Sequence, residues 1–400
     1  MNISRRQLIL GASAGLLAGS VSAHTITNNF NNEIGLRNLT TEDFNKIQWS
    51  VPNRTWDNYN RRVRANGTNL MDSINLSDQL INDDELEMPG FVGNFTKTLQ
   101  HNQLGEVDES AYLALVDGLA SGDMSNVNLS KDADRKLENP TAYRSISLYG
   151  GYPELTRLIA SPPTQGAHAA AEMIEVYWQA LTRDVAFSDY GTSSLIASAV
   201  ADLNNASYSI GPTSNGSVTS ATVFRGSTIG DLDGPYISQL LLLPFKYGAS
   251  SMEQKYAQPT ANLDFMTSFD EFLAIQNGAS PSVQQTFGTA RYIQNNRDLA
   301  NYVHSDVLFQ AYYNAAMILL QRGGLLTTGL PFANSNAEAG FVTFGGPDIL
   351  NMVTSAAHMA LTGAWYQKWI HRKVRPEAFA GLVDVQRRGL ADYGLHSDVM

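Results

Sequence analysis

Residues Gly345–Gly381, GGPDILNMVTSAAHMALTGAWYQKWIHRKVRPEAFAG, read as one long helix. Pro347 and Asp348 suit its first turn, and Pro376 marks its end because the residue before a proline disfavours the α region. The stretch between the two prolines spans about seven helical turns. It predicts a largely helical fold in which several cations gather near one end of a helix.

Lys368 and Arg375 are predicted to share one face of this helix. At about 100° per residue, seven positions bring the two side chains within about 20° of each other and roughly 10 Å apart along the axis. Trp365 and Arg372 fall on the same stripe, which would add an aromatic wall and a third cation. Such a stripe could hold a tetrahedral oxyanion, or it could be a solvated face that complements the helix dipole.

The spacing of Lys368, six further residues and then Arg375-Pro376 resembles the first of three signature segments of a known superfamily. It is shared by vanadium-dependent haloperoxidases and the phosphatidic-acid-phosphatase type of acid phosphatase. The surrounding WYQKWIHRKVRPEAFAG is similar to the algal-type bromoperoxidase branch. Further blocks resemble that branch, namely FVGNFTKTLQHNQLGEVDESAYLAL followed by KLENPTAY, then residues 224–256 and residues 297–321.

The resemblance implies an all-α helical bundle of the vanadium haloperoxidase and acid phosphatase type. It also implies a vanadate cofactor whose oxygens are held by Lys368 and Arg375, with Lys368 acting in catalysis. Trp365 and Arg372 would be the pocket wall. The expected reaction is oxidation of bromide or iodide by hydrogen peroxide to a hypohalous species that halogenates small organic substrates. Relatives of this type are commonly oligomeric, so a homo-oligomer is expected.

Two parts of the family's site have no counterpart in the sequence. The second signature segment, Pro-Ser-Gly-His, is absent from the 400 residues, and so is the third segment, which carries the vanadium-ligating histidine. His396 follows the first motif, but its context, Leu395-His396-Ser397-Asp398, does not match that ligand. The sequence therefore assigns no metal ligand in this chain.

The resemblance runs from about Phe91 to Met400 without decaying. We therefore expect an incomplete haloperoxidase whose C-terminal part is missing, and the activity of the chain on its own is left open. Two alternatives remain. An acid phosphatase of the same superfamily would use the same cations on a phosphoryl group, although such phosphatases lack the long matches outside the motif. A truncated remnant without catalysis would at most bind phosphate.

Residues 1–23 are typical of an export signal. Ser4-Arg5-Arg6 precedes an apolar run, and Val21-Ser22-Ala23 suits cleavage. The adjacent arginines favour the twin-arginine route over an ordinary secretory signal, so we expect an exported protein, periplasmic or secreted. Residues 24–90 are predicted to form an N-terminal arm, and residues 91–400 the haloperoxidase-like helical domain.

Composition argues against several classes of partner and chemistry. The chain has 27 basic and 38 acidic residues, a formal net charge of −11, which disfavours nucleic acid or anionic membranes as partners. Cysteine is absent, which excludes disulfides, thiolate catalysis and sulfur-ligated metals. After the signal no apolar run reaches about 18 residues, so no membrane span is expected in the mature protein.

Apolar spacing predicts further helices over residues 169–190, 238–243 and 297–321. The last of these has Asn296 as its expected N-cap. His168 and His304 have no partners at metal spacing and are expected to pack, cap or lie exposed. The face expected in the core of the first helix consists of Met173, Val176, Tyr177, Ala180 and Leu181. The last helix is expected to carry one continuous stripe through Leu299, Val303, Val307, Gln310 and Asn314.

Overall fold

A computed structural model describes residues 96–121, 123–131, 133–137, 162–227, 230–307, 309–323, 349–358, 360–361 and 374–400. The predicted export signal (1–23) and N-terminal arm (24–90) lie outside these ranges. So do three of the predicted site residues, Trp365, Lys368 and Arg372.

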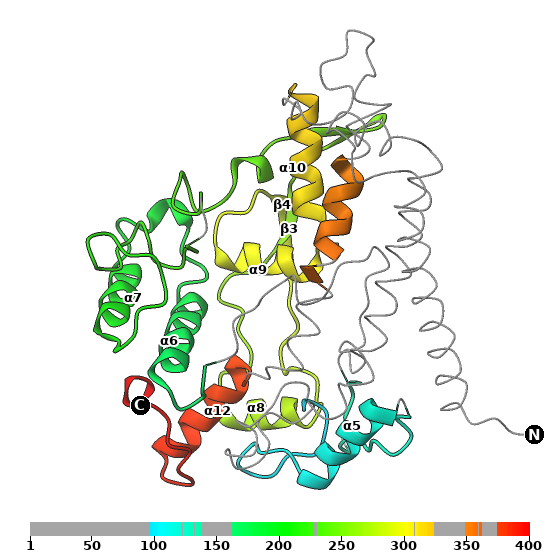
Figure 1. Ribbon diagram of the computed structural model, residues 1–400, viewed down its shortest axis with the longest axis vertical. Coiled ribbons are helices and arrows are strands. Elements are labelled where there is room, and N and C mark those ends of the chain that lie inside the picture. Colours follow the sequence, from blue (N-terminus) through cyan, green and yellow to red (C-terminus); the bar gives the residue numbers. More distant parts are fainter. Residues whose placement is uncertain are drawn as a thin grey trace, which may run out of the picture.

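Helices dominate the described part of the chain, in agreement with the predicted all-α class (Figure 1). A helical stretch also covers 349–358 and 360–361. Short 3-10 turns are η5 (Phe187–Asp189), η6 (Gln239–Leu241) and η7 (Ser397–Val399). The labelled α-helices are α5 (Glu109–Ser121), α6 (Ala167–Leu181), α7 (Ser194–Asn205), α8 (Phe269–Gln276), α9 (Asn296–Ser305), α10 (Gln310–Gln321) and α12 (Pro376–Arg387).

Two small antiparallel sheets, which the sequence did not predict, lie among the helices. Strands β1 (Phe245–Tyr247) and β2 (Ser250–Met252) form a hairpin, and β3 (Tyr256–Pro259) pairs with β4 (Phe287–Arg291). The β1–β2 turn contains Gly248 at φ +59°, a left-handed backbone that favours glycine and suits a tight hairpin. Strands this short carry too little alternation to be recognised from the sequence.

Helix α6 is shorter than predicted. It ends at Leu181, where Thr182 is the C-cap and its hydroxyl donates to the Trp178 carbonyl at 2.6 Å. The prediction of Ala180 and Leu181 as core was wrong, because both lie in the last turn and are exposed, Leu181 by 65%. The buried face consists of Ala169, Ala170, Ala171, Met173 and Ile174.

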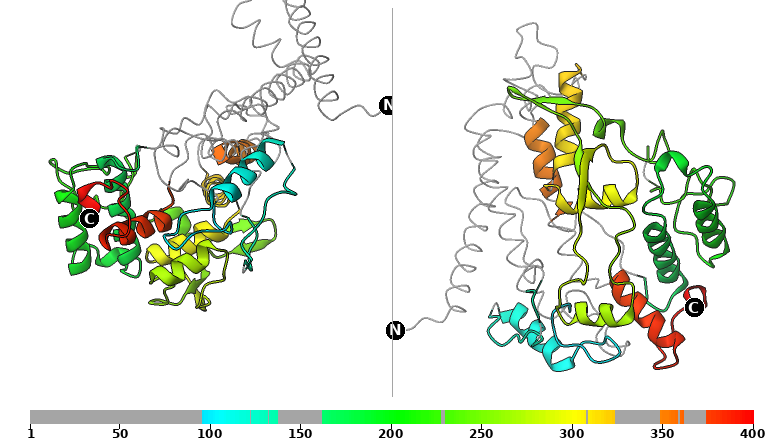
Figure 2. Two further views of the ribbon diagram at one scale, coloured as in Figure 1. Left: turned by 90° about the horizontal axis from the view of Figure 1, so that it is seen from below. Right: turned by 180° about the vertical axis from the view of Figure 1, so that it is seen from behind.

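The helix predicted over residues 297–321 is two helices that meet at a steep angle (Figures 1 and 2). Asp306 is extended at ψ 155° and ends α9, so the continuous stripe fails and Val303 and Val307 are exposed. The N-cap of α9 is Asn295 instead of Asn296, since the Asn295 side chain accepts from the Asp298 amide at 2.9 Å. The helix expected over 238–243 is only the 3-10 turn η6, capped by Ser238.

Helix α6 lies between α7 and α12 and contributes to two cores (Figure 1). Met173 packs on the α12 side, with Val374, Phe379 and Leu382 among its neighbours. Ile174, one residue further along, belongs to the α7 side. Figure 2 shows from two directions that the C-terminal end of the chain lies beside α6, where η7 contacts that helix.

A third and a fourth core lie around α9 and α10. One joins α9 to β3 and consists of Ile237, Ile293 and Tyr302. In the other, Leu350 of the 349–358 stretch packs against Phe245, Met317 and Ile318. Within the ranges described, no helix combines the length and the apolar character needed to cross a bilayer.

Candidate functional site

Arg375 is the predicted site residue that the structure places. It is the N-cap of α12, with φ −69° and ψ 149°, and Pro376 is the first residue of that helix. The expected loss of helical backbone before Pro376 is therefore confirmed. The expectation of one helix over Gly345–Gly381 was wrong, because Pro376 also begins a new helix, a position that proline favours.

Lys368 was paired with Arg375 on the assumption that both residues are helical, and the extended backbone of Arg375 removes that assumption. A separation of seven residues places two side chains on one stripe only if both are helical, and Arg375 is not. Lys368, Trp365 and Arg372 lie outside the part of the chain that the structure describes. Their assignment to a shared pocket with Arg375 stays a prediction.

Packing fixes the backbone on both sides of Arg375. Val374 is 6% exposed and belongs to the core formed by α6 and α12. The Arg375 carbonyl accepts from the Phe379 amide at 2.8 Å, which closes the first turn of α12. On the facing helix, the Tyr177 hydroxyl donates to the Pro376 carbonyl at 2.8 Å. The start of α12 is thus held against α6 at the residue next to the cation.

The guanidinium of Arg375 is paired with Glu377 in the first turn of α12. Arg375 Nε donates to Glu377 Oε1 at 2.9 Å, and Lys97 Nζ donates to the same oxygen at 2.7 Å. The exposed fractions of the three side chains are 41% for Arg375, 27% for Lys97 and 15% for Glu377. One carboxylate therefore joins two cations, and the group has a net charge of about +1.

The charge state of Glu377 follows from its surroundings. Burial alone would raise the pKa of this carboxyl, but the nearby charges of Lys97 and Arg375 and the hydrogen bond from Lys97 outweigh that effect. The pKa of Glu377 is lowered from its ordinary value as a result. Burial, followed by the charge of Glu377, raises the pKa of the Tyr177 hydroxyl. Glu377 is therefore ionised and Tyr177 neutral at neutral pH.

Lys97 and Glu377 were missed by the sequence predictions. Glu377 had a local signal, since it lies two residues after Arg375 and an acidic side chain suits the first turn of a helix. Lys97 had none, because it precedes Glu377 by 280 residues. Only the folded chain brings this lysine to the start of α12.

The three histidines considered in the sequence have structural roles or lie exposed. His168 faces Glu172 at 3.5 Å and stacks on Tyr208 at a ring distance of 4.4 Å. His304 is exposed in the last turn of α9. His396 caps η7, its Nδ1 accepting from the Asp398 amide at 3.3 Å. Among the described residues, no group of three or more His, Asp or Glu side chains is arranged to hold a metal ion.

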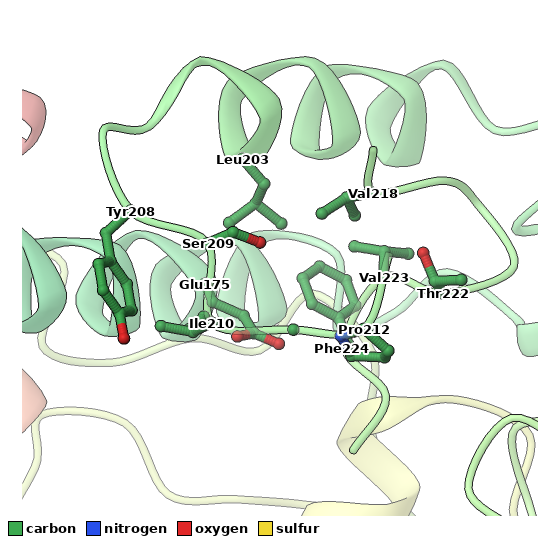
Figure 3. A pocket seen from close by; sticks show the side chains of 11 residues that line it. Glu175, Leu203, Tyr208, Ser209, Ile210, Pro212, Val218, Thr222, Val223 and Phe224 are labelled. Carbon is green, nitrogen blue, oxygen red and sulfur yellow. The ribbon is translucent and has the colours of Figure 1, made fainter. Parts of the chain in front are cut away.

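A small pocket between α6 and α7 is a second feature of interest (Figure 3). Its volume is about 10 Å³, close to the space of one water molecule. The Glu175 carboxyl lies in it near Ile210 and Phe224, with Leu203 of α7 above (Figure 3). Burial raises the pKa of this carboxyl. The pocket is too small for a vanadate or phosphate ion.

Comparison with known proteins gives relatives of one kind. No family model matches the chain. The vanadium-dependent bromoperoxidase of Ascophyllum nodosum is 35% identical over 327 residues, covering 77% of this chain and 58% of the relative. Those of Corallina pilulifera and Corallina officinalis are each 29% identical over 368 residues, covering 75% of this chain and 62% of the relative.

Comparison of the fold with solved structures leads to the same kind of protein. The solved structure of the second vanadate-dependent bromoperoxidase of Ascophyllum nodosum, described as homohexameric, matches with a TM-score of 0.74 and 30% identity. The match covers 88% of this chain and 60% of that one. The fold is thus that of a helical protein of the vanadium haloperoxidase type. The chain is a homologue of the vanadium-dependent bromoperoxidases, as its sequence predicted, and spans about three-fifths of the length of these relatives.

Proposed function

We propose that this chain supplies part of a vanadate-dependent haloperoxidase that oxidises bromide or iodide with hydrogen peroxide. The observation that carries the proposal is the position of Arg375. Its guanidinium is partly exposed, at the rigid start of α12, in a group with a net charge of about +1. The homologues named as vanadium-dependent bromoperoxidases support the choice of chemistry.

The donors at this position fit a tetrahedral oxyanion. A guanidinium offers N–H donors in one plane and accepts nothing, so its outer edge suits two oxygens of such an ion. In the proposal Arg375 binds two oxygens of vanadate and Lys368 binds one. Trp365 and Arg372 form part of the pocket wall. When bound, vanadate would activate hydrogen peroxide for attack by halide, and the protein would contribute fixed positive charge.

A protein that binds phosphate or vanadate without oxidising halide is the second candidate. The observation in its favour is the same partly exposed guanidinium of Arg375, which suits either ion whether or not a reaction follows. The two candidates differ in whether halide is oxidised, but both require the oxyanion to bind. One set of variants therefore tests the binding step of both.

The test measures the affinity of the full chain for vanadate by vanadium NMR. Wild type is compared with Lys368→Ala, Arg375→Ala and a control variant. Arg388→Ala is a matched control because Arg388 is also on the α12 segment but pairs with Asp384 on an exposed surface. Each site variant should weaken binding roughly tenfold or more through lost charge-assisted hydrogen bonds. Unchanged affinity in Arg375→Ala would refute the proposed site.

Activity assays on the same preparations separate the candidates. Vanadate-dependent bromination with hydrogen peroxide supports the haloperoxidase. Tight oxyanion binding without bromination supports the binding protein. Hydrolysis of an aryl phosphate that is inhibited by vanadate would instead favour an acid phosphatase of the same superfamily.

Export and assembly are two further parts of the proposal. The adjacent Arg5 and Arg6 ahead of an apolar run support export by the twin-arginine route, to the periplasm or the medium. Replacing both arginines by lysine should retain the precursor in the cytoplasm, and the mature protein should begin at His24. The homohexameric solved neighbour supports a homo-oligomer, which light scattering would measure directly.

A further inference from the structure

We propose that Glu377 positions Arg375 for the oxyanion, and that Lys97 prevents Glu377 from cancelling the charge of Arg375. The inference rests on the proposed function and adds two residues to its site. Neither residue needs to touch the ion, so both are positioning residues.

The hydrogen-bond geometry shows how Glu377 could orient the guanidinium. Arginine has one donor on Nε and four on the two Nη atoms. Glu377 Oε1 accepts from Nε at 2.9 Å. Among the described residues, neither Nη atom of Arg375 makes a hydrogen bond. A bidentate contact with the oxyanion would use the Nη edge, while Nε is held from the other side by Glu377.

This arrangement rests on a rigid base. The Arg375 backbone is fixed between buried Val374 and the first turn of α12. Glu377 is itself in that first turn, and its side chain is 15% exposed. A long flexible side chain loses conformational freedom when it binds a ligand, and a preformed hydrogen bond reduces that loss. Glu377 thus prepares the guanidinium before the ion arrives.

The second half of the proposal concerns charge. Glu377 alone would neutralise Arg375 and weaken its attraction for an anion. Lys97 donates to the same carboxylate oxygen at 2.7 Å, so the three side chains keep a net charge of about +1. Lys97 lies before the described helices, 280 residues ahead of Glu377, and contacts α12 only in the folded chain. The anion site therefore depends on the segment around Lys97 as well as on the signature segment.

Vanadate affinity of the full chain tests the role of Glu377 with two variants. Glu377→Gln keeps an acceptor oxygen and should bind at least as tightly as wild type. Glu377→Met has a similar volume but no oxygen acceptor, and should bind about five-fold or more weakly. A purely electrostatic role predicts tighter binding in both variants, and that result would overturn the positioning role. Equal affinity in wild type and both variants would overturn it too.

Thermal melting of the same samples separates positioning from a structural role. We expect Glu377→Gln and Glu377→Met to differ in affinity by more than their melting temperatures account for, with Glu377→Gln restoring binding. If affinity follows melting temperature across the variants, the residue is structural and the proposal fails. If Glu377→Met does not fold, Glu377→Leu takes its place in the same comparison, and unfolding of both overturns the positioning role in favour of a structural one.

Lys97→Met tests the second half, with Lys255→Met as the matched control. Lys255 also pairs with a glutamate, Glu253 at 2.7 Å, but on an exposed surface. Lys97→Met should weaken vanadate binding about five-fold at low ionic strength, and the loss should shrink at about 1 M salt, where the Debye length falls to about 3 Å. Unchanged binding in Lys97→Met overturns the charge role.

Arg375→Ala distinguishes the failure of this inference from the failure of the proposed function. If Arg375→Ala loses vanadate binding while Glu377→Met and Lys97→Met do not, only the inference fails. If Arg375→Ala binds as wild type does, or if the wild-type chain binds no vanadate, the proposed function fails for this chain and the inference fails with it.

Discussion

The ring of Phe272 in α8 lies directly against the backbone of Gly381 in α12. A Cβ atom added at Gly381 would be 2.5 Å from both Cε1 and Cζ of that ring. Gly105, at φ +79°, approaches the same ring from another segment, with a corresponding distance of 2.8 Å. Phe272 therefore fills a space that two glycines leave open, and this contact helps to place α12 and, with it, Arg375.

Substitution of Gly381 by alanine should destabilise the protein. Alanine favours a helix over glycine by about 1 kcal/mol, but overpacking against the buried Phe272 ring costs about 1–3 kcal/mol. We expect the free energy of unfolding, measured in urea, to fall. Gly191→Ala is the control, because nothing lies within 4 Å of a Cβ at Gly191. A Gly381→Ala variant as stable as wild type would contradict the close contact.

Arg297 is the centre of a partly buried ion network at the start of α9. Its side chain is 9% exposed and donates to both oxygens of Asp184, at 2.6 and 2.7 Å, and to Asp264 at 2.8 Å. A further bond reaches the Leu263 carbonyl at 3.1 Å. Hydrogen bonds from Arg297 lower the pKa of both carboxyls against the effect of their burial. The network joins α9 to the segment after α6.

Arg297→Ala should lower the free energy of unfolding by about 3 kcal/mol, because it leaves two carboxylates without their main partner. Arg388→Ala, which breaks an exposed pair with Asp384, should cost at most about 0.5 kcal/mol. Chemical denaturation of both variants checks the contrast. Equal losses would mean that the burial of Arg297 contributes nothing to the network.

His101 should make the protein less stable as the pH falls. Burial is the main cause that lowers its pKa from 6.5 to about 4, the charge of Lys97 adds to it, and the hydrogen bond to the Leu99 carbonyl opposes it. The unfolded chain takes up the proton near pH 6.5, whereas the folded chain takes it up only near pH 4. Stability is therefore lost as the pH falls between these values, by up to roughly 3 kcal/mol.

The check on His101 is His101→Gln, which cannot take up this proton. Unfolding free energies of variant and wild type, measured from pH 7.5 down to pH 4, should converge or cross, because only the wild type carries the histidine contribution. A constant difference over that range would show that His101 has an ordinary pKa.

Glu175→Gln should stabilise the protein at neutral pH. Burial raises the pKa of the Glu175 carboxyl above its ordinary 4.5, so ionisation costs more in the folded chain than in the unfolded one. The favourable contribution of the neutral acid is present below pH 4.5 and is lost as the pH rises through the folded pKa. Melting temperatures at pH 7 and pH 4 should show a gain for the variant at pH 7 only. A gain of equal size at both pH values would point to packing instead.

The sequence predicted helices where apolar spacing was long and regular, and it failed at their ends. Asp306 ends α9 because its backbone is extended, but acidic residues also occur within helices, so the break had no clear local signal. Pro376 was recognised as a boundary, yet the same proline both ends one backbone region and begins α12. The local sequence therefore marks the boundary but does not show whether a helix or a loop follows it.

The candidate site was predicted only as far as its local motif. Arg375 was found because its spacing from Lys368 and the proline that follows it resemble a family motif. Glu377 was within reach of the same reasoning, but Lys97 was not, since its contact depends on the packing of segments 280 residues apart. Long-range pairs of this kind leave no periodicity in a single sequence.

The contact between Lys97 and Glu377 also bears on how the chain is made. Tyr393 likewise donates to Glu106, 287 residues earlier, and Gln165 donates to the Tyr393 carbonyl, 228 residues later. The ribosome synthesises α12 long after the segments that α12 contacts, and contacts that close such long loops form slowly. Met173 and the other apolar residues that pack against α12 therefore stay uncovered until α12 has been made. An unfinished chain should bind chaperones that recognise apolar surface.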